Sequence, residues 1–182
     1  MLQSDSRASR WVEDAHIAAR ALMGTVVALA LVVLAIRSYT RLEMRWDTWH
    51  YHLAYAARAG RLGVRFHMDE QLAARFSGYP PLAHIVEGLL WRLTGSVNGT
   101  GVINMIGLGG FLLVCHRLVR APVYVVGLIA LSTPLVIIHA ATNYVDLWSN
   151  AFLATGLVVL VYVYLNDKQT DRLLLGVGLG SI

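Results

Sequence analysis

A nearly uncharged run of membrane length lies close to the start of the chain. The stretch "HIAARALMGTVVALALVVLAIR" begins at His16 and ends at Arg37, with Arg20 as its only other charged residue. A transmembrane helix needs about 20 predominantly apolar residues. Arg20 lies near the beginning of the run, so its guanidinium can reach back to the membrane surface. We therefore predict a membrane-spanning helix at about residues 17–36.

Later parts of the chain carry further runs of this kind, and the composition agrees with them. The chain is 57% hydrophobic and 14% charged, whereas charged residues make up about a quarter of a soluble domain. A soluble all-helical protein is therefore disfavoured. The fold class we predict is all-α, a multi-pass transmembrane helical bundle. Its other spans are expected at about residues 100–116, 121–139 (with a kink at Pro134) and 147–166, and residues 173–182 begin another.

The distribution of arginines predicts how the chain is oriented. Cytoplasmic segments carry an excess of basic residues, which assigns residues 1–16, as a loose tail, and the link containing Arg117 and Arg120 to the cytoplasmic side. A large outer loop then covers about residues 37–99. The predicted location is the plasma (inner) membrane. Because residues 173–182 are too few to cross a bilayer, we expect the chain to be the N-terminal portion of a longer protein.

A short helix is predicted inside this loop at residues 48–62. Asp47 stands at the N-cap position, and Gly60 at the position where helices end. At 3.6 residues per turn, Asp47, Tyr51, Tyr55 and Arg58 share one face. The neighbouring histidines of "RWDTWHYH" lie off that face and read as membrane-surface anchors. The loop thus offers an acid, two phenols and a guanidinium to one space.

The stretch "PPLAHIVEGLLWRLTG" predicts a second short helix. Its apolar residues form one broad face, and His84, Glu87 and Trp91 lie on the other face. This pattern is typical of a helix lying in the membrane surface, with Trp91 among the headgroups. The alternative, a further span, is disfavoured because the stretch is short and carries Glu87 and Arg92.

A second acid of interest, Asp146, lies where the span at residues 147–166 begins. In the predicted topology it faces the same side of the membrane as Asp47. Each acid alone is explained equally well as a helix N-cap, which contributes about 1 kcal/mol. The tyrosines and Trp91 are also explained as interfacial aromatics. His116 and His139, at the ends of spans, read as structural residues.

The order of these features resembles a known family. An early span is followed by an outer-loop Asp, "YHLAYAARAG", "YPPLAHIVEGLLWRLTG", "STPL" and "YVDL". This order is similar to that of the GT-C glycosyltransferases, and closest to the protein O-mannosyltransferases and aminoarabinose transferases. The resemblance covers roughly residues 18–165. It implies a multi-span enzyme that takes a sugar from a polyprenyl-phosphate carrier at the outer membrane face.

The resemblance also implies roles for particular residues. Asp47 would be the catalytic acid/base, and Asp146 would shape the site or hold a divalent metal where one is used. Tyr51 and His52 match the family's Tyr-His step, whereas Tyr79 replaces its usual His or Lys, so the role of that position is in doubt. The candidate substrate-binding residues are Arg45, Tyr51, His52, Tyr55, Arg58, Tyr79, His84 and Glu87.

The predicted function is therefore transfer of a sugar to an acceptor hydroxyl on a lipid, glycan or protein. Such transfer needs a base near the acceptor oxygen and cations near the departing phosphate, and arginine suits the latter. The predicted partners are a lipid-linked sugar donor and membrane lipids, and nothing in the chain resembles a nucleic-acid-binding domain. Two alternatives stay open: a non-catalytic membrane protein, such as a transporter or assembly subunit, and an inactive fragment of the enzyme.

Overall fold

The computed structural model describes residues 5–42, 48–64 and 82–166, and these residues are helical throughout apart from turns and links. Arg45, Asp47 and Tyr79, three of the predicted site residues, lie outside the described residues. The elements, in chain order, are α1 (Asp5–Thr40), the π-helical turn η1 (Thr48–His52), α2 (Leu53–Ala59), α4 (Leu82–Thr94), the 3₁₀ turn η2 (Val97–Gly101), α5 (Val102–Val114), the π-helical turn η3 (Cys115–Val119), α6 (Val123–Leu131), α7 (Pro134–Ala140) and α8 (Asp146–Asn166).

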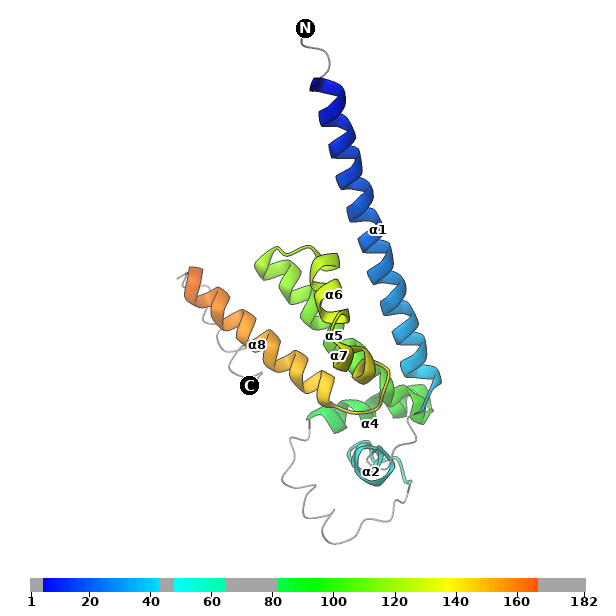
Figure 1. Cartoon of the computed structure of the whole chain (residues 1–182). Helices are drawn as coiled ribbons and strands as arrows, with labels where there is room; N and C mark the ends of the chain where they lie inside the picture. The colour runs from blue at the N-terminus through cyan, green and yellow to red at the C-terminus, as the bar shows by residue number, and fades with distance from the viewer. Residues whose placement is uncertain (1–4, 43–47, 65–81, 167–182) are drawn as a thin grey trace.

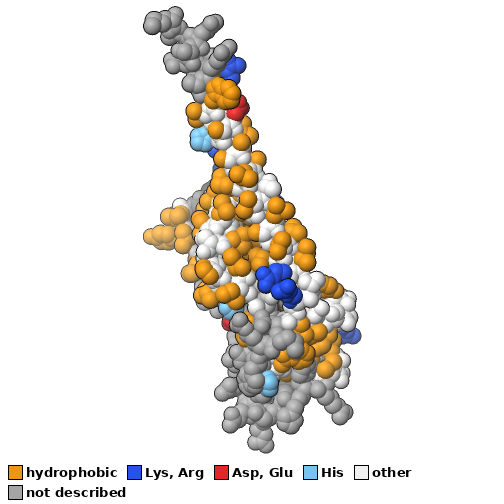
Figure 2. Space-filling view, turned by 45° about the vertical axis from the view of Figure 1, so that its right-hand side comes forward, with side chains coloured by type: hydrophobic (Ala, Val, Ile, Leu, Met, Phe, Trp, Pro, Cys, Tyr) orange, Lys and Arg blue, Asp and Glu red, His pale blue; other side chains and the backbone are white. Residues whose placement is uncertain are grey.

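Three of the described helical stretches are long and apolar enough to cross a membrane: Arg10–Thr40, Val97–Val119 and Asp146–Leu165. They correspond to the spans predicted at about residues 17–36, 100–116 and 147–166. Figure 2 shows apolar side chains over most of the narrow part of the molecule, as a lipid-facing surface requires. The predicted all-α fold class is thus confirmed for the described residues, which include three helices apolar enough to cross a membrane. The run at residues 173–182 lies outside the described residues.

The first helix begins earlier than we predicted. Residues 1–16 were expected to form a loose tail, yet α1 is already helical at Asp5 and continues without a break to Thr40. The stretch "SRASRWVEDAHIAARAL" contains no proline or glycine, the two residues that most disfavour a helix interior. Because nothing interrupts the helix, the span and the preceding polar residues form one rod.

The third predicted span, 121–139, is broken rather than kinked. Helices α6 and α7 lie at 93° to each other. Thr133 has an extended backbone, with φ −89° and ψ 112°, and Pro134 is at the first turn of α7. A residue before proline avoids the α region, whereas proline itself suits a first turn. Pro134 therefore begins a new helix instead of bending an existing one.

Helices α2 and α4 lie together at one end of the bundle, where α1 ends and α8 begins (Figure 1). We call this the α2–α4 end. The link between α5 and α6 lies toward the opposite end, in the direction of the N-terminus. At the centre of the bundle, α5 packs on α8, where a Cβ built on Gly107 would lie 3.1 Å from the Cα of Trp148. The buried residues Leu34, Leu108, Leu112, Ala140 and Leu147 form the main apolar cluster.

Candidate functional site

The crossing of α2 and α4 depends on two glycines. A Cβ built on Gly60 would lie 2.7 Å from the carbonyl oxygen of Gly88, and one built on Gly88 would lie 2.6 Å from the nitrogen of Gly60. Both distances are below ordinary van der Waals contact, so only glycine lets the two backbones approach this closely. Gly60 has φ −75°, and the left-handed residue is the next one, Arg61, with φ 50°. Gly60 follows the last residue of the helix, as predicted, although the helix stops at Ala59 instead of continuing to residue 62. Gly60 is required for the crossing rather than for its turn.

This close crossing buries a histidine and an acid from α4. The Nδ1 atom of His84 lies 3.0 Å from Oε2 of Glu87, and their side chains are 4% and 0% exposed. Burial disfavours the charged form of each group. It lowers the pKa of His84 from 6.5 to about 4 and raises the pKa of Glu87 well above its usual value. Burial therefore favours the uncharged form of both partners in this hydrogen bond.

The polarity of α4 is the reverse of that of a helix in a soluble protein. His84 and Glu87 are buried, while the apolar residues Leu82, Ile85, Leu89 and Leu93 are exposed. We predicted that the apolar and polar residues form separate faces. The structure adds that the polar face contacts the rest of the protein. An exposed apolar face suits contact with lipid, and the 13 residues of α4 are fewer than the roughly 20 that a span needs.

His52 is at the centre of the α2–α4 end. It is 4% exposed, and its ring centroid lies 4.2 Å from that of Tyr51, 5.5 Å from that of His84 and 5.3 Å from that of Tyr144. Burial and the neighbouring His84 lower the pKa of His52 from 6.5 to about 3. Our interpretation of His52 as a surface anchor off the helix face was wrong. It assumed α-helical spacing, whereas Thr48–His52 is a π-helical turn, which rotates each side chain away from its α-helical position.

The link between α7 and α8 contributes the rest of the cluster. The ring of His139 lies 5.8 Å from that of Tyr144, and Nδ1 of His139 lies 3.5 Å from Oδ2 of Asp146. The side chain of Asp146 is 57% exposed, and that of His139 is 26% exposed. Asp146 is the first residue of α8, as predicted. It therefore offers an accessible carboxylate beside a histidine.

Asn104 of α5 holds this link in place. Its buried side-chain amide donates to the carbonyl oxygens of His139 at 2.9 Å and Thr142 at 3.0 Å, and also contacts that of Tyr144. Its Oδ1 accepts a hydrogen bond from the N–H of Trp148 at 3.0 Å. That N–H belongs to the first turn of α8, where backbone donors lack partners within the helix. The beginning of α8 is thus capped by Asn104 of α5. The carboxylate of Asp146 lies beside His139 instead.

Together these contacts form a continuous series of polar and aromatic side chains from three separate segments. The series runs from Glu87 through His84 to His52 of the α2 region, then through Tyr144 and His139 to Asp146. It is buried and neutral at Glu87 and accessible at Asp146. The accessible carboxylate of Asp146 can accept a proton or bind a cation. The buried contacts hold the three segments together.

The other predicted residues occupy different positions. Tyr55 is 1% exposed, and its ring lies 6.1 Å from that of Tyr51 and 5.2 Å from that of His84. Arg58 lies on α2 and is exposed. The predicted shared face therefore holds for the two tyrosines, whose aromatic rings lie near each other, and Arg58 is exposed at the end of α2.

Three residues of the cluster were not predicted as site residues: Asn104, His139 and Tyr144. Asn104 interrupts the apolar run "GVINMIGLGGFLLV", and a polar residue inside a span is a signal in itself. His139 reaches the cluster because α7 turns away from α6 by 93°, a much larger change of direction than the kink predicted at Pro134. No group of three or more His, Cys, Asp or Glu residues in the described part of the chain is arranged to hold a metal ion.

Comparisons with protein-family models, with curated proteins and with solved structures give no match to this chain.

Proposed function

We propose that this chain belongs to a membrane glycosyltransferase that moves a sugar from a polyprenyl-phosphate donor to an acceptor hydroxyl. The observation that carries the proposal is the series from Glu87 to Asp146 at one end of the bundle. Its members come from segments far apart in the sequence, and it ends in an accessible carboxylate at the beginning of an apolar span. A donor held in the membrane meets an acceptor at this depth.

The chemistry assigned to the site is general base catalysis with phosphate stabilisation. Asp47, from the sequence, and Asp146 are the carboxylates proposed to take the acceptor proton and to shape the site. Arg45 and Arg58 are the cations proposed for the departing phosphate. His84 and Glu87 are neutral and buried, so we assign them to holding α2 against α4 rather than to contact with substrate.

The outer face of the plasma membrane is the proposed location of the site. The beginning of α1, which contains Arg10, and the link between α5 and α6, which contains Arg117 and Arg120, lie toward the end of the molecule opposite α2 and α4 (Figure 1). Basic residues favour the cytoplasmic side. The arginines of residues 37–99 do not oppose this assignment, because the rule weakens for loops of about 60 residues or more, and we therefore assign the α2–α4 end and Asp146 to the outer side.

A transporter is the second candidate, and one observation favours it. Helices α6 and α7 form a broken apolar pair, and transporters use discontinuous helices to bind substrates near the middle of the membrane. However, the ionisable groups that the structure brings together lie beyond the candidate spans or at their ends, rather than in their middle. Their position favours chemistry at the membrane surface.

Asp-to-Asn substitutions test the proposal. The full-length protein in membrane vesicles is incubated with labelled polyprenyl-phosphate sugars of several kinds. The transfer of label to lipid, glycan and protein fractions is then measured. Asparagine caps a helix about as well as aspartate but cannot act as a base. We expect Asp47→Asn to lower transfer by about 100-fold or more, Asp146→Asn to lower it less, and the control Asp14→Asn to leave it unchanged.

Two results would contradict this proposal. Near wild-type transfer by Asp47→Asn would mean that Asp47 is only a cap. No transfer by the wild-type protein from any donor, together with accumulation of a labelled solute inside the vesicles, would favour the transporter.

A further inference from the structure

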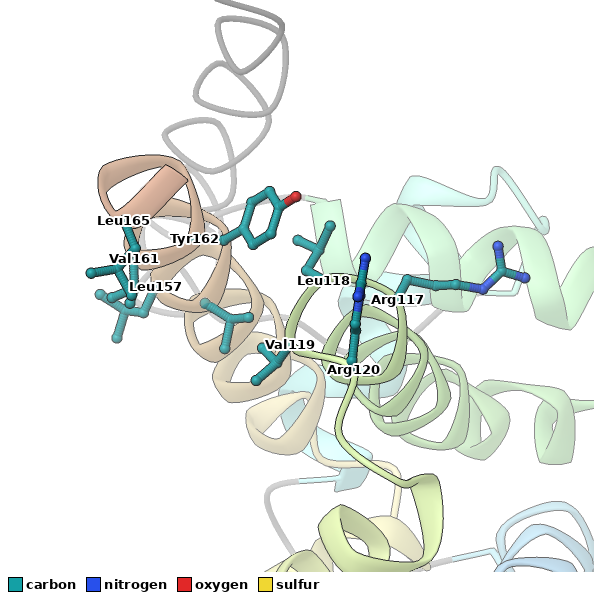
Figure 3. Close-up of a pocket in the computed structure, with 9 residues that line it drawn as sticks. Arg117, Leu118, Val119, Arg120, Leu157, Val161, Tyr162 and Leu165 are labelled. Carbon is teal, nitrogen blue, oxygen red and sulfur yellow. The ribbon is translucent and has the colours of Figure 1, made fainter. Parts of the chain in front are cut away.

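An open groove lies between η3 and α8, at the end of the bundle opposite α2 and α4. It has a volume of about 690 Å³, and its walls are mainly apolar (Figure 3). Leu118 and Val119 form one wall, and Leu157, Val161 and Leu165 of α8 form the other. Val161 is 56% exposed and Leu165 is 72% exposed, so the described residues leave the α8 wall uncovered.

Polar side chains stand at the rim of this groove. Arg117, Arg120 and Tyr162 all line it, and Figure 3 shows the hydroxyl of Tyr162 and the guanidinium of Arg120 near the same edge, with Arg117 reaching away from α8. These residues lie at the ends of two candidate spans, Val97–Val119 and Asp146–Leu165. That is the depth of lipid headgroups, where arginine binds phosphate and tyrosine is enriched.

The backbone of Arg120 adds an independent observation. Its φ is 58° and its ψ is 22°, in the left-handed region where glycine is favoured. The turn is closed by a hydrogen bond from the N–H of Ala121 to the carbonyl oxygen of Cys115 at 3.4 Å, and His116 Nδ1 donates to the carbonyl oxygen of Ala121 at 3.2 Å. These contacts fix the backbone of Arg120 at the edge of the groove.

We propose that this groove binds an anionic phospholipid. The phosphate contacts Arg120, Arg117 adds positive charge at the same turn, and one acyl chain lies along Leu157, Val161 and Leu165 of α8. Charge complementarity selects an anionic headgroup over a zwitterionic one, and the apolar wall selects a lipid over a soluble phosphate. Basic pockets between membrane-spanning helices recognise headgroups in this way.

Lipid retention by the purified protein tests the proposal. The natural-length protein in detergent is mixed with phosphatidylglycerol or phosphatidylcholine of identical acyl chains, and the bound fraction is measured by native mass spectrometry. We expect the wild-type protein to retain phosphatidylglycerol about tenfold better, since both lipids carry the phosphate but the choline cation of phosphatidylcholine is repelled by the two arginines and cancels the net negative charge. The double variant Arg117→Gln/Arg120→Gly should retain both lipids equally.

Arg61 provides the matched control. It is also an arginine with positive φ, 50°, but it follows α2 at the other end of the molecule. Arg61→Gly should keep the preference for phosphatidylglycerol. Arg120→Gly relieves the backbone and is expected to fold, and Arg117→Gln alters an exposed side chain, so each single variant should lower the preference on its own.

Three outcomes would overturn the proposal. The first is equal retention of both lipids by the wild-type protein, which would mean that something else fills the groove, such as residues 167–182 or a second copy of the chain. The second is a preference that survives in the double variant. The third is complete displacement of the lipid by an equal concentration of glycerol phosphate, which would indicate a site for soluble phosphate.

Discussion

His84 and Glu87 form a buried hydrogen bond, one turn apart on α4, in which burial favours the uncharged form of both partners. Their atoms Nδ1 and Oε2 are 3.0 Å apart. Because both groups are neutral, the pair avoids the large desolvation penalty of a buried ion pair. The free energy of unfolding should therefore depend on keeping the hydrogen bond rather than on keeping the acid.

Substitutions at Glu87 test this directly. Glu87→Gln keeps the shape and the hydrogen bond and should change the free energy of unfolding by less than about 1 kcal/mol. Glu87→Ala leaves Nδ1 of His84 unpaired beside a cavity and should lower the free energy of unfolding by roughly 3 kcal/mol. Chemical unfolding in detergent at neutral pH, followed by circular dichroism, measures both. Equal destabilisation by the two variants would indicate that Glu87 is ionised in the folded protein.

The same groups predict how stability varies with pH. Burial lowers the pKa of His52 from 6.5 to about 3 and that of His84 from 6.5 to about 4, so the unfolded state takes up protons first as pH falls. Each histidine then lowers stability by up to roughly 1.4 kcal/mol per pH unit below 6.5. Burial raises the pKa of Glu87, so the unfolded state loses its proton first as pH rises above about 4.5, and stability falls.

Between pH 4.5 and 6.5 the two histidines outweigh the single acid, and above pH 6.5 only the acid contributes. The combined contribution of the three groups should therefore be greatest near pH 6.5. Unfolding midpoints measured from pH 4 to pH 9 test this, with Glu87→Gln as the matched variant. That variant should lose the decline above pH 6.5 and keep the decline below it. An unchanged alkaline limb would rule out Glu87 as its cause.

The contact between Gly60 and Gly88 predicts a steric effect. In Gly88→Ala the added Cβ meets the backbone of α2, which cannot move away as a side chain can, so α2 and α4 should separate. We expect a loss of roughly 1–3 kcal/mol in the free energy of unfolding. Gly109→Ala is the control, because a Cβ there has nothing within 4 Å, and it should be neutral or slightly stabilising. Similar losses for both would mean that the two helices do not cross this closely.

Asn104 predicts the largest single loss. Asn104→Ala removes the donor to the carbonyl oxygens of the α7–α8 link and the acceptor for Trp148 N–H. Buried groups left without partners cost about 1–3 kcal/mol each, so we expect a total loss of roughly 3 kcal/mol or more. The release of the link should also make the backbone amides of residues 141–145 exchange hydrogen faster. Asn98→Ala, a partly exposed position, serves as the control for both measurements.

The spans were predictable because each is encoded by a local property. A run of about 20 apolar residues has few stable alternatives to a helix across the membrane, as the helical stretches Arg10–Thr40 and Asp146–Leu165 illustrate. The end of α2 at Gly60 and the beginning of α8 at Asp146 were also local signals. The separation of α4 into an apolar and a polar face followed from helical spacing alone.

The tertiary structure decided which of these residues meet. No spacing in the sequence indicates that α4 presents His84 and Glu87 to α2, that a π-helical turn directs His52 inward, or that α7 brings His139 to Asp146. These arrangements depend on contacts between segments far apart in the sequence, such as the approach of Gly60 to Gly88, 28 residues apart, and the hydrogen bond of Asn104 to Thr142, 38 residues apart. Periodicity determines the faces of a helix, but only packing against other segments determines which face is buried.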